Sequence, residues 1–430
     1  MNARKLFFLG LALLPLAPSF GQKNIDQKNV ERLIRTLAAD DMMGRQTFTP
    51  GIEKAAAFIS AEFQKIGLKP LPGDTDFQQE FTMYSLTPKK AEVELNDKDL
   101  KPEEFFISTS HRKFEWDEKA PQPLFIGEAD DFRQGLAKVR QQERNLLVVV
   151  HPKHQDLFNR YGTYVRRSSP ITEVGKGHTT VFVLSAETQV SELEVEMEND
   201  VQEMKLANVA GMIPGKRANE YVVFSGHYDH IGIMKPVAGD SIANGADDDA
   251  SGTTAVMALA QHFKKGPKPE RTLLFVAFTA EEIGGFGSQH FSRQLNPDEI
   301  VAMFNIEMIG KGSKFGPNTA YITGFEKSDF GSLLQEAVKG TAYSFHPDPY
   351  PSQNLFYRSD NATLAHLGVP AHTISSVQID QDKLYHSVDD EVESLDLAHM
   401  TSMIKAIALG AKDFVDGKKT PKRVDKTQVQ

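Results

Sequence analysis

Three consecutive aspartates are the most unusual group of charged residues in this sequence. They lie in the stretch NGADDDASGT, residues 244–253, between two glycines. Adjacent carboxylates repel one another, and a solvated turn rarely needs three of them. A bound cation offsets this repulsion, because carboxylate oxygens are good ligands for divalent ions. The triplet therefore predicts a cation site, provided that other parts of the chain supply further ligands.

Four other segments carry histidine or carboxylate side chains that could complete such a site. They are GHYDHIG (226–232), TAEEIGGFGS (279–288), NIEMIG (305–310) and YHSVDD (385–390). Each has an ordinary explanation when it is taken alone. A His-x-Asp pair usually lies on the surface, paired glutamates before glycine often cap a helix, and a lone histidine is usually structural. The motifs gain meaning only if the fold brings them together.

The chain from about residue 206 alternates between strand and helix patterns, which predicts how the motifs are positioned. YVVFSG, RTLLFVAFTA, IVAMFNI and AHTISS are typical of buried strands, and the segments between them have helical spacing. We therefore predict an α/β fold, with a mostly parallel mixed sheet sandwiched by helices. Ligands bind beyond the carboxyl ends of the strands in such sheets. Five separate loops then deliver His, Asp and Glu side chains to one edge of the sheet.

The rest of the chain divides by composition. Helical spacing in 29–44 and 52–67 assigns residues 22–80 to the main domain, which resumes over 206–417. Short β-prone pieces joined by charged connectors predict an inserted strand-rich module at 81–205. The polar, basic tail 418–430 is expected to fray.

The N-terminus predicts export. Basic residues in MNARK precede a short apolar run with two prolines, and small residues follow, so residues 1–21 read as a signal peptide cleaved after Gly21. A retained membrane anchor is the alternative, but the run is short for a span of about 20 residues. The absence of cysteine excludes disulfides and thiolate metal sites. The net charge of −10 disfavours nucleic acid as a partner. Nothing in the sequence indicates an oligomeric state.

In order and spacing, the five motifs resemble those of the M28 family of co-catalytic zinc exopeptidases. The resemblance covers roughly residues 25–80 and 205–415 and leaves out the predicted insertion. It implies two Zn²⁺ ions, with cobalt or manganese as possible substitutes. Two divalent ions about 3.5–4 Å apart can activate a hydrolytic water and polarise a carbonyl.

The resemblance also implies a role for each motif residue. Asp248 bridges the two ions, and the peptide bond between Asp248 and Asp249 is expected to be cis. Glu281 is the general base. The other expected ligands are His227, Glu282, Glu307 and His386, and Asp229 fixes the ring of His227. His230 competes with His227 as a ligand, but the family spacing favours His227.

Glu307 departs from the family pattern, because it stands where an aspartate is usual. A glutamate can still ligate, but its side chain is one methylene longer. The expected consequences are a shift of one ion, an altered metal preference or a change in how the substrate terminus is held.

The function implied by the resemblance is that of an exported aminopeptidase. It would release N-terminal residues from peptides by attack of a hydroxide bound to the two metals. A carboxypeptidase is an alternative, with Arg358 reading the substrate carboxylate. A one-zinc glutaminyl cyclase and a non-catalytic binding protein on the same scaffold are further alternatives. Metal counting, together with assays on N-blocked and C-blocked peptides, separates these alternatives.

Overall fold

The computed structural model describes residues 25–119, 121–166 and 170–429, and these form two compact units. Unit 1 combines the chain up to Gln78 with Val209–Gln430, and unit 2 is Gln79–Asn208. The expected strand-rich module of residues 81–205 falls inside unit 2. The expected signal peptide, residues 1–21, lies outside the described residues. No helix in the described chain combines the length and apolar character needed to cross a membrane.

Unit 1 is built on a mixed sheet whose neighbouring strands run β7, β11, β8, β12, β15, β13 and β14. The pairs β11–β8, β12–β8, β12–β15 and β13–β14 are parallel, while β11–β7 and β13–β15 are antiparallel. The bounds are β7 (Glu192–Ile213), β8 (Arg217–His227), β11 (Arg271–Phe278), β12 (Ile300–Ile306), β13 (Thr319–Ile322), β14 (Ser344–Pro347) and β15 (Ala371–Ser375).

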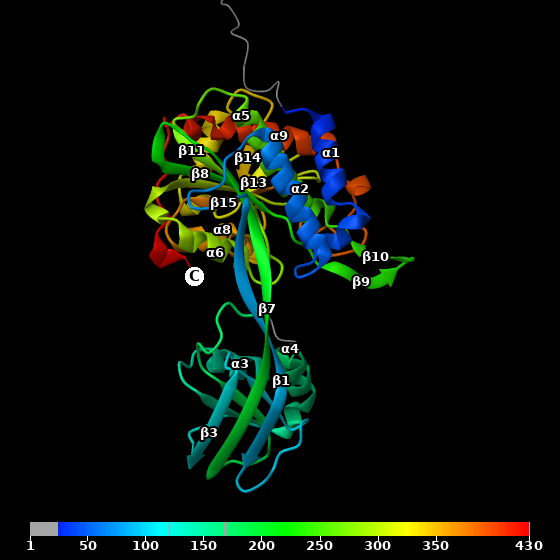
Figure 1. Cartoon of the computed structure of the whole chain (residues 1–430), viewed down its shortest axis with the longest axis vertical. Coiled ribbons are helices and arrows are strands. Elements are labelled where there is room, and N and C mark those ends of the chain that lie inside the picture. Colours follow the sequence, from blue (N-terminus) through cyan, green and yellow to red (C-terminus); the bar gives the residue numbers. More distant parts are fainter. Residues whose placement is uncertain (1–24, 120, 167–169, 430) are drawn as a thin grey trace, which may run out of the picture. The chain divides into compact units, whose positions relative to one another are not determined.

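Helices cover both faces of this sheet, as Figure 1 shows. Alternate residues of one strand serve opposite faces: Phe224 packs into one buried cluster and Val223 into the other. The first cluster includes residues of α1 (Gln27–Leu37), α2 (Pro50–Ile66), α5 (Gly252–Lys264), α7 (Phe330–Ala337) and α9 (Leu397–Val415). The second includes residues of α6 (Phe286–Gln294) and α8 (Asn361–His366). The predicted fold class, a mostly parallel sheet sandwiched by helices, is confirmed.

The predicted helix 29–44 is shorter than expected. The first helix ends at Leu37, and Met43 to Arg45 adopt left-handed backbone angles. The physical reason is the buried Arg45 side chain, which turns inward to donate hydrogen bonds to backbone carbonyls. The second predicted helix begins at Pro50 and ends before Gly67, whose φ of 83° is accessible to glycine at little cost.

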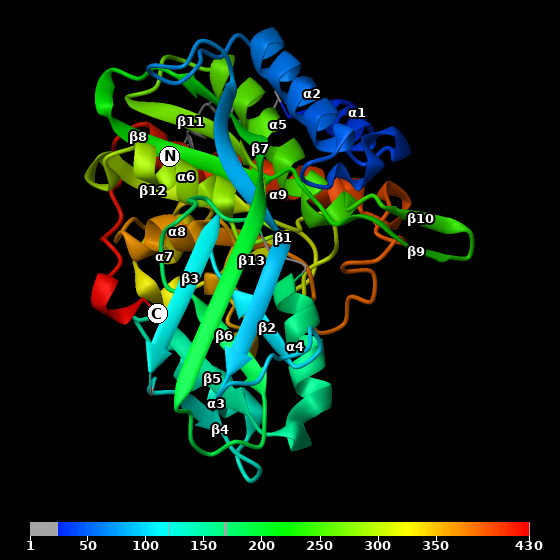
Figure 2. The same ribbon diagram turned by 60° about the horizontal axis from the view of Figure 1, so that its bottom comes forward.

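A two-stranded hairpin interrupts the alternation of strands and helices. Its strands are β9 (Gly232–Val237) and β10 (Asp240–Ala243), and Figure 2 shows it extending from unit 1. The hairpin connects the end of β8 with the aspartate triplet. The hairpin was not predicted from the sequence, because GIMKPVAGDSIA has no regular alternation of apolar and polar residues.

The expectation that residues 418–430 fray was wrong for the described part of that tail. Val424 is buried, and its backbone N–H donates to the carbonyl of Gly368. The guanidinium of Arg423 donates to the carbonyl of Ile300 at 2.8 Å. A basic composition does not prevent ordering when the cationic groups find backbone carbonyls to bind.

Unit 2 contains two clusters of buried hydrophobic residues. In one sheet β7 pairs with β1 (Gln78–Leu95) and β3 (Lys113–Lys119). A separate sheet has the order β2 (Phe105–Ser108), β6 (Thr180–Leu184), β5 (Leu146–Val150) and β4 (Leu124–Ile126). Within the described residues of unit 2, the α-helices are α3 (Phe132–Arg140) and α4 (Gln155–Arg166).

Candidate metal centre and active site

The carboxyl ends of neighbouring parallel strands carry most of the site. β8 ends at His227, and Glu307 directly follows the last residue of β12. Glu281 and Glu282 come shortly after the end of β11. Asp248 lies in the wide helical turn η3 (Ala246–Ser251), immediately before α5. Because these strands are parallel neighbours, their carboxyl ends meet at one edge of the sheet.

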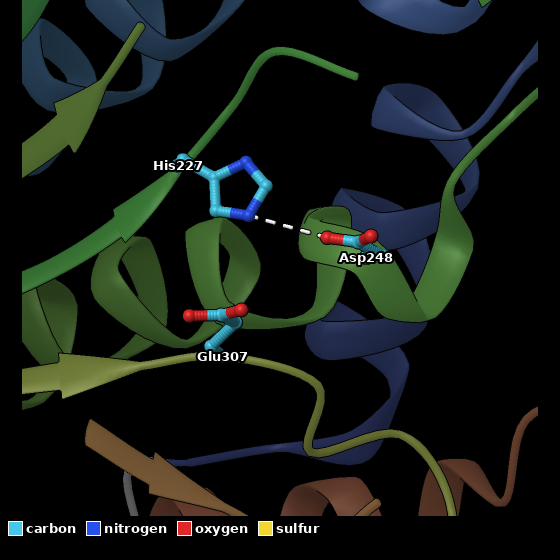
Figure 3. A group of neighbouring side chains, drawn as sticks. All are labelled: His227, Asp248 and Glu307. Atoms are coloured by element: carbon cyan, nitrogen blue, oxygen red, sulfur yellow. Dashed lines mark ion pairs between the residues drawn. The ribbon is translucent and has the colours of Figure 1, made fainter. Parts of the chain in front are cut away.

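His227, Asp248 and Glu307 form the first group of potential metal ligands. One ligand atom from each lies within 4.8 Å of the others. Nε2 of His227 is 3.2 Å from Oδ1 of Asp248. Figure 3 shows the three side chains facing one another, with His227 at the end of its strand. Glu307 therefore places a carboxylate oxygen within this group, although its side chain is one methylene longer than the usual aspartate.

Glu282 and His386 gather around the other oxygen of Asp248. Nε2 of His386 lies 3.1 Å from Oδ2 of Asp248 and 3.1 Å from Oε2 of Glu282. His230 is also present, and its ligand atom lies within 4.8 Å of those of Asp248 and Glu282. The two carboxylate oxygens of Asp248 thus face two separate groups of donors.

The hydrogen bonds of the aspartate triplet distinguish its three members. Oδ1 of Asp247 accepts from the backbone N–H of Gly310 at 2.7 Å. Asp249 accepts from the backbone N–H groups of His227 and Met308. The carboxylate of Asp248 faces His227 and His386 instead. The peptide bond between Asp248 and Asp249 is cis, as the resemblance predicted.

Asp229 contacts the site mainly through the loop that carries the paired glutamates. Its two carboxylate oxygens accept from the backbone N–H groups of Glu281 at 3.1 Å and Glu282 at 3.3 Å. Nδ1 of His227 lies 3.1 Å from the backbone carbonyl of Asp229 and 3.8 Å from its carboxylate. Asp229 therefore contacts both the paired glutamates and His227, and its carbonyl oxygen is placed to accept a hydrogen bond from Nδ1 of the His227 ring.

Glu281 belongs to neither ligand group and lines a pocket beside them. Gly284, Ser288, Arg293 and Arg358 line the same pocket. Burial raises the pKa of the Glu281 carboxyl well above its usual value. A carboxylate with a raised pKa accepts a proton more readily, which is what a general base near neutral pH requires.

The electrostatics of the site show an excess of buried acid. Burial lowers the pKa of His227, but the adjacent Asp248 carboxylate and the Glu281 charge outweigh it and raise that pKa well above its usual value. Contacts with Asp248 and Glu282 raise the pKa of His386 to about 10. Burial raises the pKa of Glu307 to about 7. These shifts all indicate that the site favours added positive charge.

The residues present fit divalent ions of the zinc type. Imidazole nitrogens and carboxylate oxygens are the usual zinc ligands at roughly 2.0–2.2 Å, so neighbouring ligands of a tetrahedral ion are about 3.3–3.6 Å apart. The contacts of His227 and His386 with Asp248, at 3.2 and 3.1 Å, are close to that spacing. The Nε2 atoms of His227, His230 and His386 and Oε2 of Glu307 are buried without a hydrogen-bond partner in the described chain. Such atoms are available to ligate.

Three site loops carry a non-glycine residue with left-handed backbone angles. These residues are Ala280 (φ 60°), Met308 (φ 53°) and His386 (φ 55°). Each costs on the order of 1–3 kcal/mol, and such conformations cluster at functional sites where surrounding contacts hold them. Ala280 directly precedes Glu281, Met308 directly follows Glu307, and His386 is itself an expected ligand.

Some supporting residues were missed by sequence analysis. The guanidinium of Arg45 is fully buried and donates to the carbonyls of Tyr228, Asn244 and Gly245, which flank the ligand residues. Only its position in a GR dipeptide marks it in the sequence. Asp390 accepts from the backbone N–H groups of Asp247 and Asp248 at 3.0 and 3.1 Å. It lies within the YHSVDD motif, so its position was visible although its partners were not.

Comparison with known proteins decides the family. Residues 208–411 match the model of Peptidase family M28. This part of the chain belongs to peptidase family M28. The resemblance predicted from the five motifs is thereby confirmed, and the matched M28 segment contains every predicted site residue.

Curated relatives of the M28 segment carry aminopeptidase names. Leucine aminopeptidase 1 of Ajellomyces capsulatus is 31% identical over 214 residues, which are 46% of this chain and 53% of that protein. A probable leucine aminopeptidase of Trichophyton verrucosum is 30% identical over 213 residues, 46% of this chain and 55% of that protein. The chain therefore spans about half the length of the curated relatives it matches.

Solved structures resemble the whole chain in fold. An aminopeptidase from Aneurinibacillus sp. strain AM-1 superposes with a TM-score of 0.55 at 16% identity, covering 96% of this chain and 98% of that one. A zinc aminopeptidase from Bacillus subtilis gives a TM-score of 0.54 at 15% identity, covering 94% and 99%. At these identities the likeness concerns the fold.

Proposed function

We propose that this protein is a zinc-dependent aminopeptidase that removes N-terminal residues from peptides. The observation that carries the proposal is the position of Asp248, whose two carboxylate oxygens face two different sets of His and Glu side chains beside Glu281. The aminopeptidase names of its M28 relatives support the choice of peptides as substrates.

Two ions are assigned to the two ligand groups. His227, Asp248 and Glu307 would hold one ion, and Asp248, Glu282 and His386 the other. When bound, the ions lower the pKa of a water molecule and polarise the carbonyl of the scissile bond. The side chains would hold both ions at a largely buried position, where the charges of the ions would be weakly screened.

Glu281 moves the proton in this proposal. Its carboxylate accepts a proton from the attacking water, and it then donates that proton to the nitrogen of the leaving amine. The backbone hydrogen bond from Glu281 to Asp229 fixes the loop that carries the base. The raised pKa of the buried Glu281 carboxyl suits both halves of this transfer.

Arg358 favours a second candidate, a carboxypeptidase. Arg358 lines the pocket next to Glu281 and also the pocket next to Glu307. An arginine there can bind a free carboxylate through paired hydrogen bonds. Peptides blocked at one end decide between the two activities: an aminopeptidase cleaves the C-blocked peptide and spares the N-blocked one.

The decisive variant is Glu281→Gln, which preserves the shape of the side chain and removes its basicity. We expect kcat to fall by about 10²–10⁴, the usual contribution of a general base, while two ions per chain remain bound. Metal content by mass spectrometry and turnover of a C-blocked peptide measure the two effects. Glu326→Gln, at an exposed position, serves as the control. Full turnover in the Glu281 variant would remove the base assignment.

The proposal also places the mature enzyme outside the cytoplasm. The basic residues and apolar run before Gly21 support this placement. N-terminal sequencing of the protein recovered from the exported fraction should start at Gln22, and a start at Met1 would contradict cleavage.

A further inference from the structure

His230 contacts the site without belonging to the ligand set that the family resemblance implies. It is 1% exposed and follows His227 by three residues, in the loop after β8. Its Nδ1 lies 2.7 Å from Oε1 of Glu282. The other oxygen of Glu282, Oε2, lies 3.1 Å from Nε2 of His386. The two oxygens of one carboxylate therefore have different neighbours.

The chemistry of this contact fixes where the proton lies. An ionised carboxylate can only accept hydrogen bonds, so Nδ1 of His230 must carry the donated hydrogen. A protonated ring nitrogen has no free lone pair and cannot ligate a metal through that atom. His230 in this arrangement is a hydrogen-bond donor to Glu282.

The distance supports the same assignment. Two ligands of one tetrahedral zinc ion are about 3.3–3.6 Å apart, whereas a charge-assisted N–H to carboxylate hydrogen bond is about 2.7–2.9 Å long. The contact between His230 and Glu282, at 2.7 Å, has the length of the hydrogen bond. The contacts of His386, at 3.1 Å, are closer to the spacing of shared ligands.

Contacts with Arg45 and Gly245 hold His230 in place. Its backbone N–H donates to the carbonyl of Arg45 at 3.2 Å. A Cβ atom added at Gly245 would lie 2.5 Å from Cδ2 of His230, so the ring packs directly against that glycine. The guanidinium of Arg45 binds the carbonyl of Gly245 at 2.8 Å. A donor supported in this way costs little to orient when Glu282 binds an ion.

We infer that His230 is a positioning residue for the second metal ion. It donates Nδ1–H to Oε1 of Glu282, and so directs Oε2 toward His386 and Asp248, which would hold the ion together with Glu282. This inference rests on the proposed two-ion function, and it adds a residue through which the chain sets the affinity of one of the two ions.

The test measures metal binding to the full-length chain stripped of metal by a chelator. Titration with Co²⁺, followed by its visible absorption, should show two binding steps in the parent protein. In His230→Leu the step assigned to the Glu282 group should weaken by about 10–100-fold, the usual effect of losing an outer hydrogen bond to a ligand. The step assigned to the His227 group should be unchanged.

Two amide variants separate positioning from direct ligation, and they replace the leucine variant if it fails to fold. An asparagine amide nitrogen takes the place of Nδ1, and a glutamine amide nitrogen takes the place of Nε2. We expect His230→Asn to bind the second Co²⁺ almost as tightly as the parent, and His230→Gln to lose affinity as the leucine variant does. His262→Leu, on α5, is the matched histidine control.

The outcomes distinguish this inference from the proposed function. If the parent protein binds fewer than two ions, the two-ion function fails. If the parent binds two ions and His230→Gln also binds both with parental affinity, the positioning role of His230 is overturned. Equal loss in the asparagine and glutamine variants also overturns it, because that result indicates direct ligation.

Discussion

Two regions of unit 1 bury histidines and treat them in opposite ways. At the metal centre His227 is buried, and burial lowers its pKa, but the contact with the Asp248 carboxylate outweighs burial and raises that pKa well above its usual value. His372 on β15 is fully buried, and burial lowers its pKa to about 4. The ring of His372 lies between the hydroxyl of Ser328 and the carbonyl of Thr323, at 2.7 and 2.9 Å.

The difference shows that burial alone does not make a metal site. Burial disfavours the charged form of any imidazole, and only neighbouring carboxylates reverse that effect. His372 has neutral partners and stays a neutral core residue, stacked on Phe330. The centre around Asp248 has more buried acid than its histidines can neutralise, which is the condition that divalent ions satisfy.

The variant with the largest expected effect on the metal centre is Asp248→Asn. This change removes the carboxylate shared by both ligand groups, so we expect both ions to bind weakly. Peptidase activity should fall at least about a thousandfold, equivalent to ~4 kcal/mol of transition-state stabilisation. Metal analysis after dialysis and a C-blocked peptide assay test this. A variant that retains two ions and near-parental turnover would show that Asp248 does not bridge.

Lys311 extends the comparison. Its positive charge neutralises buried carboxylates next to the centre, which is the role that metal ions would have at the centre itself. Its Nζ lies 2.7 Å from Asp382 and 3.2 Å from Asp390. We expect Lys311→Met to lower the free energy of unfolding by about 3 kcal/mol, because it leaves buried carboxylates unpaired. Urea unfolding of metal-free protein measures this, with Lys314→Met as the exposed control. If the Lys311 and Lys314 variants have equal free energies of unfolding, the stabilising role of the ion pairs from Lys311 to Asp382 and Asp390 is contradicted.

The smallest effect concerns the neutral histidine. Because the folded pKa of His372 is about 4 and the unfolded value is about 6.5, the unfolded chain binds more protons between these values. Its contribution to stability is complete above pH 6.5 and is lost as pH falls toward 4, by up to about 3 kcal/mol. Chelator-treated His372→Gln should therefore lose less stability than the parent between pH 7 and 4. If urea unfolding shows that the variant and the parent lose the same free energy of unfolding between pH 7 and 4, the lowered pKa of His372 is refuted.

Some of the site was predictable because the chemistry follows strand ends. The apolar runs before His227 and Glu307 mark buried strands, and parallel strands deliver the residues after them to a common edge. The aspartate triplet was conspicuous because three adjacent carboxylates are unusual. The family resemblance then supplied the choice of Asp248, which the hydrogen bonds of Asp247 and Asp249 support.

Other features depend on contacts between distant segments. The partner of His230 lies 52 residues away, and Arg45 reaches carbonyls about 200 residues away. The tail was expected to fray because its basic composition gives no sign of the carbonyl of Ile300 that binds Arg423. Composition describes a segment, whereas order depends on what packs against it.

By itself, the sequence determined the alternation of strands and helices, the excess of acid near residue 248 and the set of donor types suited to a divalent ion. These follow from local pattern and side-chain chemistry. Only the tertiary structure decided which oxygen of Glu282 faces His386 and which faces His230, because that choice depends on distances of a few tenths of an ångström between loops far apart in the chain.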